Sequence, residues 1–331
     1  MYILSRLFNP EIFQGKHKRK NYFEGWYYKI VDKNETNSFA LIPGIAYDKD
    51  KNAHAFIQVI DSIEYRTEYN KFSVSDFKYS ETDLHVSVGN NIFTKDSIDI
   101  NMENEDYPVS GHLQFYDIEP FPKKWTRPGI MGPFSFVPFM ECYHGVVNIH
   151  HKIKGQLMIN NKLVDFTDGY GYIEKDWGRS FPKWWVWIQS NHFSEKDTSL
   201  MFSIAKIPWL GSHFTGFISF LKIKGKMSLF ATYTGAKVRH LEYKDGSIDI
   251  LVEDKRYSLR ISGKYKENGV LIAPKNGLMD RKISESISST VKVSLRDQSG
   301  NIIFEDYGEN AGLEVVGQHL YPQINMANNI E

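Results

Sequence analysis

The sequence predicts an all-β protein made of two antiparallel units, and three observations support this prediction. Short segments rich in β-branched and aromatic residues recur along nearly the whole chain. Turn signals separate these segments, and no amphipathic helical pattern longer than about ten residues appears between them. Related segments also recur in the same order in the two halves of the chain. Short strands at such spacing are typical of antiparallel sandwiches and barrels.

Each expected strand is a run rich in β-branched and aromatic residues, which favour β structure. Turn-forming residues stand at the ends of many of these runs. Gly89, Gly246 and Gly300 each stand beside an asparagine, aspartate or serine and mark three of these turns. The expected strands are, in chain order, 25–31, 38–47, 54–61, 71–77, 83–89, 184–190, 199–207, 215–223, 247–254, 256–265 and 289–297.

The two halves of the chain share a weak internal repeat. The matching segments are 26–30 with 185–189 at a shift of 159, then 38–41 with 199–202 and 55–57 with 216–218 at a shift of 161. Chance similarity between two β-rich halves is the alternative, but the common order and spacing favour a duplication. The first unit is expected to span residues 1–175 and the second 176–331.

The stretch 118–143 breaks the strand pattern. It holds five prolines and four phenylalanines, and proline prevents regular strand pairing. Loops of this length are uncommon in compact domains and often act as lids or binding loops. Its apolar content predicts that it covers a pocket or forms a buried crossover between the two halves, and one loop could do both. It is also the candidate for peripheral contact with a membrane surface.

Composition excludes several classes of protein. Lys+Arg and Asp+Glu are both 40, so the net charge is zero and no basic surface for nucleic acid is expected. The single cysteine, Cys142, rules out an intramolecular disulfide framework and indicates a reducing compartment. There is no signal-peptide pattern and no apolar run near the ~18 residues of a membrane span. The sequence therefore predicts a cytoplasmic protein without nucleic-acid partners.

Two further chemistries have little support. Cys142 and His144 share a strand face, as a nucleophile and its base would, but a single buried cysteine is more often inert. His144 and His150 are also in phase, yet no third ligand follows at a sensible spacing. No metal site and no cofactor are predicted.

The stretch 168–191 is the most unusual in the chain, because it combines four of the seven tryptophans with three acidic residues. Alternate side chains of a strand share a face. The faces expected on this basis are Tyr172, Glu174 and Asp176; Glu24, Trp26 and Tyr28; and Trp185, Trp187, Gln189 and Asn191. Each face mixes aromatic rings with acids or amides, which suits a mostly apolar ligand with a few oxygen atoms.

A carboxyl group in such a pocket can act as a general acid, because desolvation raises its pKa. Facing aromatic rings can stabilise a developing cation. This combination suits protonation of an alkene followed by capture of the carbocation by an oxygen atom. The alternative is structural: Glu174 or Asp176 pairs with Lys175, Arg179 or Lys183, and Glu24 accepts backbone hydrogen bonds.

Four segments together resemble the tocopherol cyclase family. They are FEGWYYKI at 23–30, PFMECYHGVV at 138–147, GYGYIEKDWGRSFPKWWVWIQSNHF at 169–193 and LIAPKNGLMDRKISESISSTVKV at 271–293. They run in the family's order along almost the whole chain, and the long central motif is specific. The resemblance implies two lipocalin-like β units, in agreement with the repeat. It extends more distantly to the lipocalin-like carotenoid hydratases and to fungal cyclases that form decalins.

The resemblance also implies a reaction. Plant and cyanobacterial members close a chromanol ring on a prenylated quinol without a cofactor, by protonation of the prenyl double bond and attack of the phenol oxygen. We therefore expect acid-catalysed cyclisation or hydration of a prenylated or terpenoid substrate. The alternatives are a lipocalin-like carrier or sensor of a hydrophobic molecule, and a scaffold in which the motifs are purely structural.

The predicted site residues lie in the matching motifs. The predicted catalytic residues are Glu24, Tyr28, Glu174 and Asp176, with one of the three acids donating the proton. The predicted substrate-binding residues are Trp26, Glu141, His144, Tyr172, Trp177, Trp187, Gln189 and Asn191. Among them, Trp26, Trp177 and Trp187 are expected to stabilise the cation, and His144, Gln189 and Asn191 to orient substrate oxygens.

Overall fold

The computed structural model of the chain describes residues 6–209, 212–266 and 269–317. The chain divides into two compact units. Unit 1 comprises Met1–Phe181 and Gly269–Ile283, and unit 2 comprises Pro182–Asn268 and Ser284–Glu331. The chain therefore changes unit after Phe181, whereas the sequence suggested residue 175, and unit 1 also takes in a segment of the second half.

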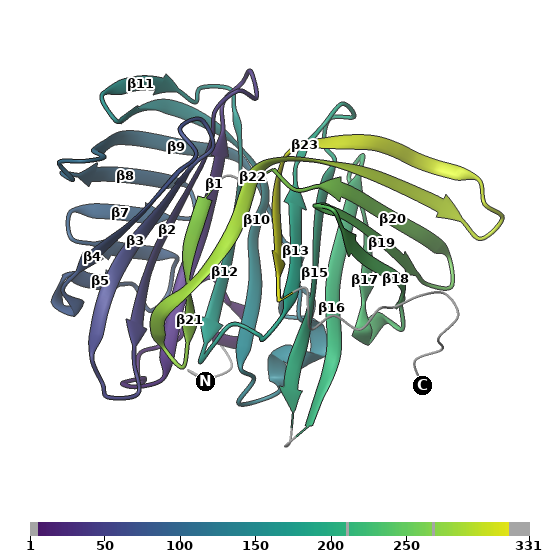
Figure 1. Cartoon of the computed structure of the whole chain (residues 1–331), viewed down its shortest axis with the longest axis horizontal. Helices are drawn as coiled ribbons and strands as arrows, with labels where there is room; N and C mark the ends of the chain where they lie inside the picture. Colours follow the sequence, from purple (N-terminus) through teal and green to yellow (C-terminus); the bar gives the residue numbers. More distant parts are fainter. Residues whose placement is uncertain (1–5, 210–211, 267–268, 318–331) are drawn as a thin grey trace. The chain divides into compact units, whose positions relative to one another are not determined.

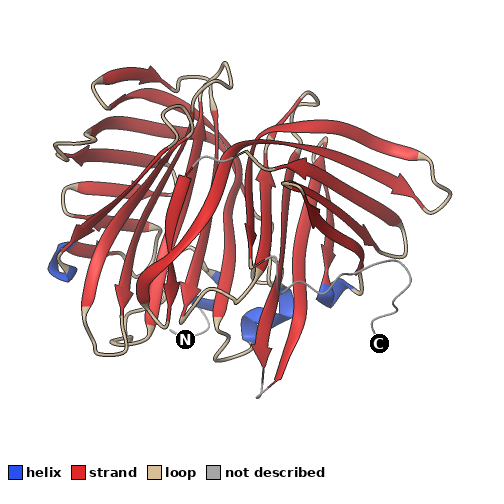
Figure 2. Cartoon of the chain, viewed as in Figure 1, coloured by secondary structure: helices blue, strands red, loops and turns tan. Residues whose placement is uncertain are grey.

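Nearly every element is a β-strand, which confirms the predicted fold class (Figure 2). Helical structure in the described residues is limited to residues 6–8 and to three short 3-10 helices, η1 (Val74–Asp76), η2 (Gly132–Phe136) and η3 (Thr232–Thr234). No helix in the described part of the chain is both long and apolar enough to cross a membrane.

Unit 1 is built on a twelve-stranded antiparallel sheet with the order β4-β3-β2-β1-β12-β10-β9-β8-β7-β6-β5, and β11 pairs with β10 (Figure 1). Its strands are β1 (Tyr22–Val31), β2 (Ser38–Tyr47), β3 (Ala53–Asp61), β4 (Arg66–Phe72), β5 (Phe77–Tyr79), β6 (His85–Val88), β7 (Asn91–Thr94), β8 (Ser97–Met102), β9 (Val109–Pro120), β10 (Cys142–Ile159), β11 (Lys162–Asp165) and β12 (Tyr170–Gly178). Near one end of the sheet, β6 contacts β2 and β3 near the other end, so the sheet curls around one core.

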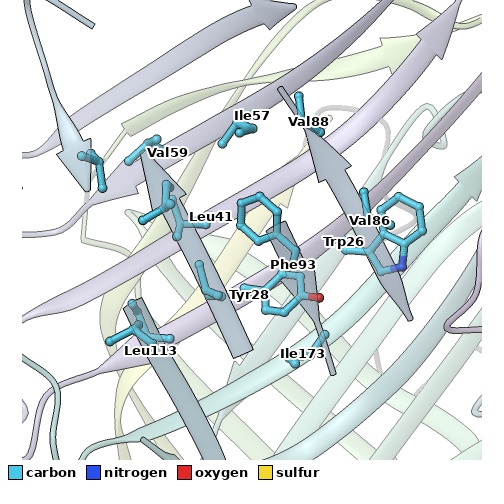
Figure 3. Packing of buried hydrophobic residues seen from close by; sticks show 14 of the residues in the cluster. Trp26, Tyr28, Leu41, Ile57, Val59, Val86, Val88, Phe93, Leu113 and Ile173 are labelled. Carbon is cyan, nitrogen blue, oxygen red and sulfur yellow. The ribbon is translucent and has the colours of Figure 1, made fainter. Parts of the chain in front are cut away.

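The core of unit 1 explains why these segments form strands. Trp26 and Tyr28 of β1, Leu41 of β2 and Ile57 of β3 alternate with residues of the other face and meet Phe93 of β7 inside the curl (Figure 3). Burying an aliphatic or aromatic side chain of this size contributes about 1.5–3 kcal/mol. The period-2 pattern of the sequence is therefore the pattern of one buried face.

The second sheet has the order β17-β16-β15-β13-β23-β22-β20-β19-β18, with β14 pairing with β23 and β21 with β22. Its strands are β13 (Trp185–Ser190), β14 (His192–Phe193), β15 (Ser199–Trp209), β16 (Ser212–Ile223), β17 (Lys226–Ala231), β18 (Lys237–Lys244), β19 (Ser247–Glu253), β20 (Tyr257–Lys264), β21 (Gly269–Lys275), β22 (Leu278–Asp297) and β23 (Ile302–Val316). The strand β21 and the start of β22 belong to unit 1.

The two sheets repeat one strand order. The strands β4-β3-β2-β1-β12-β10-β9-β8-β7 correspond one to one with β17-β16-β15-β13-β23-β22-β20-β19-β18. This is the arrangement that an internal repeat of the sequence requires.

The sequence match was nevertheless one residue out of register at the first strand. Trp26 faces the core of unit 1, whereas the core-facing residues of β13 in unit 2 include Val186 and Ile188. Trp185, which the match aligned with Trp26, and Trp187 therefore point to the opposite face, because side chains alternate along a strand. A shift of 160, from Trp26 to Val186, aligns the two cores.

Candidate functional site

The strand β12 presents two chemically different faces. Ile173 belongs to the core of unit 1, and Trp177 packs against that core. Tyr172, Glu174 and Asp176 alternate with these residues and point to the opposite face. The pairing of β12 with β1 on one side and β10 on the other divides the predicted site residues between these faces.

On the core face, Glu24 is an anchor. Its Oε1 lies 2.5 Å from the Nζ of Lys175, and both side chains are fully buried. Glu24 also accepts hydrogen bonds from the backbone N–H groups of Gln14 and Gly15, at 2.8 and 2.9 Å, and from the hydroxyl of Tyr22 at 2.6 Å. These partners occupy both carboxylate oxygens, so Glu24 serves the fold and is not arranged as a proton donor.

Trp26 and Trp177, which were expected to stabilise a substrate cation, face the ammonium group of Lys175. The Nζ of Lys175 lies 4.7 Å from the ring centroid of Trp26 and 4.8 Å from that of Trp177. It donates hydrogen bonds to the carbonyls of Pro10 and Ile12 at 2.8 and 2.5 Å. Burial lowers the pKa of Lys175 to about 8, although the charge of Glu24 acts in the opposite direction. The contacts tie the N-terminal segment to β12.

Tyr28 is also part of the core, where its hydroxyl donates a hydrogen bond to the carbonyl of Thr94 at 2.8 Å. Glu24, Trp26, Tyr28 and Trp177 therefore share one face and one structural environment. The structure separates them from Tyr172, Glu174 and Asp176.

The opposite face holds a continuous chain of polar groups. The Tyr172 hydroxyl donates to Glu174 Oε2 at 2.7 Å, and this oxygen lies 3.5 Å from His144 Nε2. The other imidazole nitrogen, Nδ1, lies 2.9 Å from Asp176 Oδ1. His144 is directly opposite Asp176 in the pairing of β10 with β12, which explains how the two strands bring these side chains together. We call Tyr172, Glu174, His144 and Asp176 the polar relay.

The members of the polar relay differ in exposure. The side chains of Glu174 and His144 are 6% and 13% exposed, and that of Asp176 is 26% exposed. Burial, and then the charge of Glu174, raises the pKa of the Tyr172 phenol well above its usual value. Tyr172 therefore keeps its proton and remains the donor to Glu174.

Cys142 lies at the end of the same face. Its Sγ is 3.8 Å from Asp176 Oδ1, and burial together with the charges of Asp176 and Glu141 raises the pKa of the thiol. A thiol that resists ionisation is a poor nucleophile. The geometry therefore gives no support to a pair of Cys142 and His144.

Two residues of β1, Tyr27 and Lys29, also lie on this face, although the sequence had not indicated them as site residues. Tyr27 is directly opposite Glu174, and Lys29 is directly opposite Tyr172. Gly25 is opposite Asp176, and an added Cβ there would be in ordinary van der Waals contact with Ile42 at 3.6 Å. Alternation along β1 places Gly25, Tyr27 and Lys29 on one face, but only the register shows which residues of β12 they accompany.

The polar relay also contains the residues that could hold a metal ion. Among the described residues, ligand-type atoms of His144, Glu174 and Asp176 lie within 4.8 Å of one another. The two carboxylates approach different nitrogens of the same imidazole, so one ion would use Nε2 and Glu174 and leave Asp176 as the partner of Nδ1. Two protein ligands are fewer than the three of catalytic zinc sites. The arrangement fits proton transfer better than metal binding.

The loop before β10 contacts the polar relay at the backbone of His144. The N–H of His144 donates to the sulfur of Met131 at 3.2 Å. The next anchor is Tyr143, whose hydroxyl donates to the carbonyl of Val137 at 2.8 Å and whose ring stacks on Trp177 at 5.4 Å. In the same loop, the Glu141 carbonyl accepts a hydrogen bond from the N–H of Arg179 at 2.8 Å.

Three predicted residues lie in unit 2. The ring of Trp187 covers Gly312, where an added Cβ would lie 2.5 Å from it, and the amide of Gln189 donates to Asn191 at 3.4 Å. The indole of Trp185 donates to Glu314, an acid of β23 that the sequence reasoning had not singled out. The polar relay, in contrast, lies wholly within unit 1.

Comparison with known proteins gives both a family and related folds. The family described as Tocopherol cyclase-like matches residues 113–317. Two crystal structures of CghA, one of them with Sch210972, have TM-scores of 0.55 and 0.54 at 10% identity, over 90% of this chain and 89% of theirs. Kievitone hydratase from Nectria haematococca has a TM-score of 0.50 at 11% identity, over 93% of this chain and 94% of its own.

No curated protein matches the chain in sequence. At about a tenth sequence identity, the likeness to CghA and kievitone hydratase concerns the fold alone. The family match is different in kind, because it covers more than half of the chain and includes His144, Glu174 and Asp176. The chain therefore belongs to the Tocopherol cyclase-like family.

Proposed function

We propose that the protein catalyses the cofactor-independent, acid-catalysed cyclisation or hydration of a prenylated or terpenoid substrate, and that the polar relay transfers the proton. The observation that carries this proposal is the sequence of contacts from Tyr172 through Glu174 and His144 to Asp176, in which two hydrogen bonds flank a longer contact of 3.5 Å between Glu174 and His144. Family membership, together with the likeness to a hydratase, supports a cyclase-like or hydratase-like function.

Glu174 is the proton donor in this proposal. Its proton adds to one carbon of a substrate alkene, and the positive charge develops on the more substituted carbon. In cyclisation a phenol oxygen of the substrate attacks that carbon, and in hydration a water molecule attacks it. The attacking oxygen then loses its proton, which returns to the ionised Glu174. The cycle is balanced without an oxidant, a reductant or a cofactor.

The neighbours of Glu174 have distinct roles. Tyr172 donates a hydrogen bond to the carboxylate that remains after proton donation and so stabilises it. His144 stands between the two carboxylates and can return a proton through Nε2, while Asp176 orients the ring through Nδ1. Tyr27, directly opposite Glu174, offers an aromatic ring beside the place where the cation develops.

The test is turnover of prenylated hydroquinones in D2O, followed by mass spectrometry and NMR. A cyclase yields an isomer that carries one deuterium on carbon, because the acid delivers a solvent-derived proton to the alkene. A hydratase yields the same label with one added water. A carrier returns the compound unchanged and unlabelled.

The variant Glu174→Gln is expected to lower the rate by about 10²–10⁴-fold, the usual contribution of a general acid. Asp168→Asn is the matched control, because it makes the same change of an acid to an amide at an exposed residue just before β12. Wild-type turnover by Glu174→Gln would refute the assignment of the donor. A loss of turnover after treatment of the wild type with a chelator would instead favour a metal centre at His144 and Glu174.

A further inference from the structure

The loop before β10 carries aromatic rings that the fold leaves in solvent. Trp125 is 83% exposed, Phe139 is 94% exposed and Phe136 is 45% exposed. The ring of Phe8 stacks on Trp125 at 5.6 Å and lies edge-on to Phe136 at 6.3 Å. Phe8, Trp125 and Phe136 therefore form one cluster. Large apolar side chains grouped on a surface mark a site of interaction. We call residues 121–139 the docking loop.

Phe139 is exposed at a cost to the backbone. Its φ is 62°, in the left-handed region, which costs a non-glycine residue about 1–2 kcal/mol. A bulky side chain is rare in that region, where asparagine or glycine is accommodated more easily. Its ring is almost fully exposed, so packing within the chain does not compensate. Folding therefore does not explain a phenylalanine at this position.

The charge of the docking loop has a single sign. It contains Lys123, Lys124 and Arg127 and no acidic residue. Lys123 pairs with Glu11 at 2.8 Å. Arg127 lies over the ring of Phe121 at 5.4 Å and donates to a backbone carbonyl, and among the described residues neither Arg127 nor Lys124 forms an ion pair. Two positive charges therefore stand beside the exposed rings.

We propose that the docking loop binds the surface of an anionic phospholipid bilayer. Aromatic rings are enriched at the headgroup level of membranes, and lysine and arginine beside them are attracted to anionic headgroups. The same loop contacts His144 through Met131 and Tyr143 through Val137. A hydrophobic substrate could thus leave the bilayer close to the polar relay. The inference goes beyond the proposed function and does not depend on it.

The test is co-sedimentation with vesicles of phosphatidylcholine and phosphatidylglycerol, compared with phosphatidylcholine alone, in the absence of any substrate. The wild type is expected to bind the mixed vesicles more tightly, and added salt is expected to weaken that binding. Trp125→Ala and Phe139→Asn are each expected to weaken it about tenfold, as the loss of one buried aromatic ring would. Phe139→Asn is expected to leave the unfolding temperature unchanged or to raise it, because asparagine adopts the left-handed backbone conformation with less strain than phenylalanine.

Tyr65→Asn is the matched control. Tyr65 is also aromatic, 65% exposed and left-handed, with φ of 50°, but it lies in the turn between β3 and β4. It is expected to bind vesicles as the wild type does. The proposal fails if the wild type does not bind mixed vesicles, or if Tyr65→Asn weakens binding as much as Phe139→Asn. Because no substrate is present, neither result bears on Glu174 as the proton donor.

Discussion

At the scale of single residues, the same pattern of an acid beside aromatic rings has two different meanings in this chain. Glu24 meets an ammonium and three hydrogen-bond donors on the core face, whereas Glu174 meets a phenol and an imidazole on the other face. The first environment holds a buried ion pair. In the proposed reaction, the groups of the second environment exchange a proton with the substrate. What an acid can do therefore follows from its partners, and of these two acids only Glu174 lies within the residues that match the family.

The buried pair of Glu24 and Lys175 makes a prediction about stability. Glu24→Gln is expected to lower the free energy of unfolding by about 3–5 kcal/mol, because it leaves a buried ammonium without its charge partner. The double variant Glu24→Gln with Lys175→Met is expected to be more stable than Glu24→Gln alone, since no unpaired charge remains. Urea unfolding followed by tryptophan fluorescence measures both. A single variant that costs less than about 1 kcal/mol would show that the pair is not an anchor.

At the scale of elements, β10 decides which histidines meet β12 on which face. Its pairing with β12 shifts register between Val146 and Asn148 and again before His151. Each shift exchanges the faces of the following residues, and bulges of this kind are frequent next to active sites. His144 precedes both shifts and lies beside Asp176 on the outer face, and the second shift restores the phase that the first one changed. His151 lies opposite Gly171 on the core face, where its ring stacks on Phe115 at 4.1 Å.

His151 makes a prediction about pH. It is fully buried, neither ring nitrogen has a hydrogen-bond partner among the described residues, and burial lowers its pKa to about 3. Between pH 6.5 and 3 the unfolded chain binds a proton that the folded chain does not, so stability falls as the pH falls. At pH 5 the loss is about 2 kcal/mol relative to neutral pH. His151→Leu is expected to reduce this dependence, which thermal unfolding at several pH values would measure. An unchanged slope would mean that His151 is protonated in the folded state.

At the scale of the whole molecule, unit 1 depends on residues from the second half of the chain. The Gln58 side chain donates to the carbonyl of Ile272 at 3.1 Å and accepts from its N–H at 2.9 Å. Met279 packs with Phe23 and Phe56 on the face of β1 and β3 that lies away from the core. The hairpin of β21 and the start of β22 thus covers a surface of unit 1, although it follows most of unit 2 in the sequence.

The turn of this hairpin allows a test of that dependence. Gly277 has φ of 76°, and an added Cβ would lie 1.9 Å from the carbonyl oxygen of Tyr47. Gly277→Ala is expected to reduce hydrogen-exchange protection in β2 and β3 of unit 1, because the turn must move. Gly300→Ala is the control, since Gly300 also has a positive φ of 86° but has open space around its Cβ position. Equal loss of protection in β2 and β3 for both variants would contradict this account.

The sequence by itself determined the all-β class, the repeated order of the strands and the pairing of aromatic rings with acids in one stretch. These features are local or periodic, so β propensity and alternation are enough to find them. The same reasoning grouped Tyr172, Glu174 and Asp176 on one face, and the structure has them there.

Only the tertiary structure decided which acid stands beside which partner. A one-residue change of register moves a side chain to the other face, and the sequence match was one residue out at the first strand of unit 2. The partner of Glu24 is 151 positions away in Lys175, and the partner of Asp176 is 32 positions away in His144. Contacts between distant strands depend on the register of every hairpin and bulge between them. Alternation shows which residues of one strand share a face, but only strand pairing shows which residues of a neighbouring strand lie beside them.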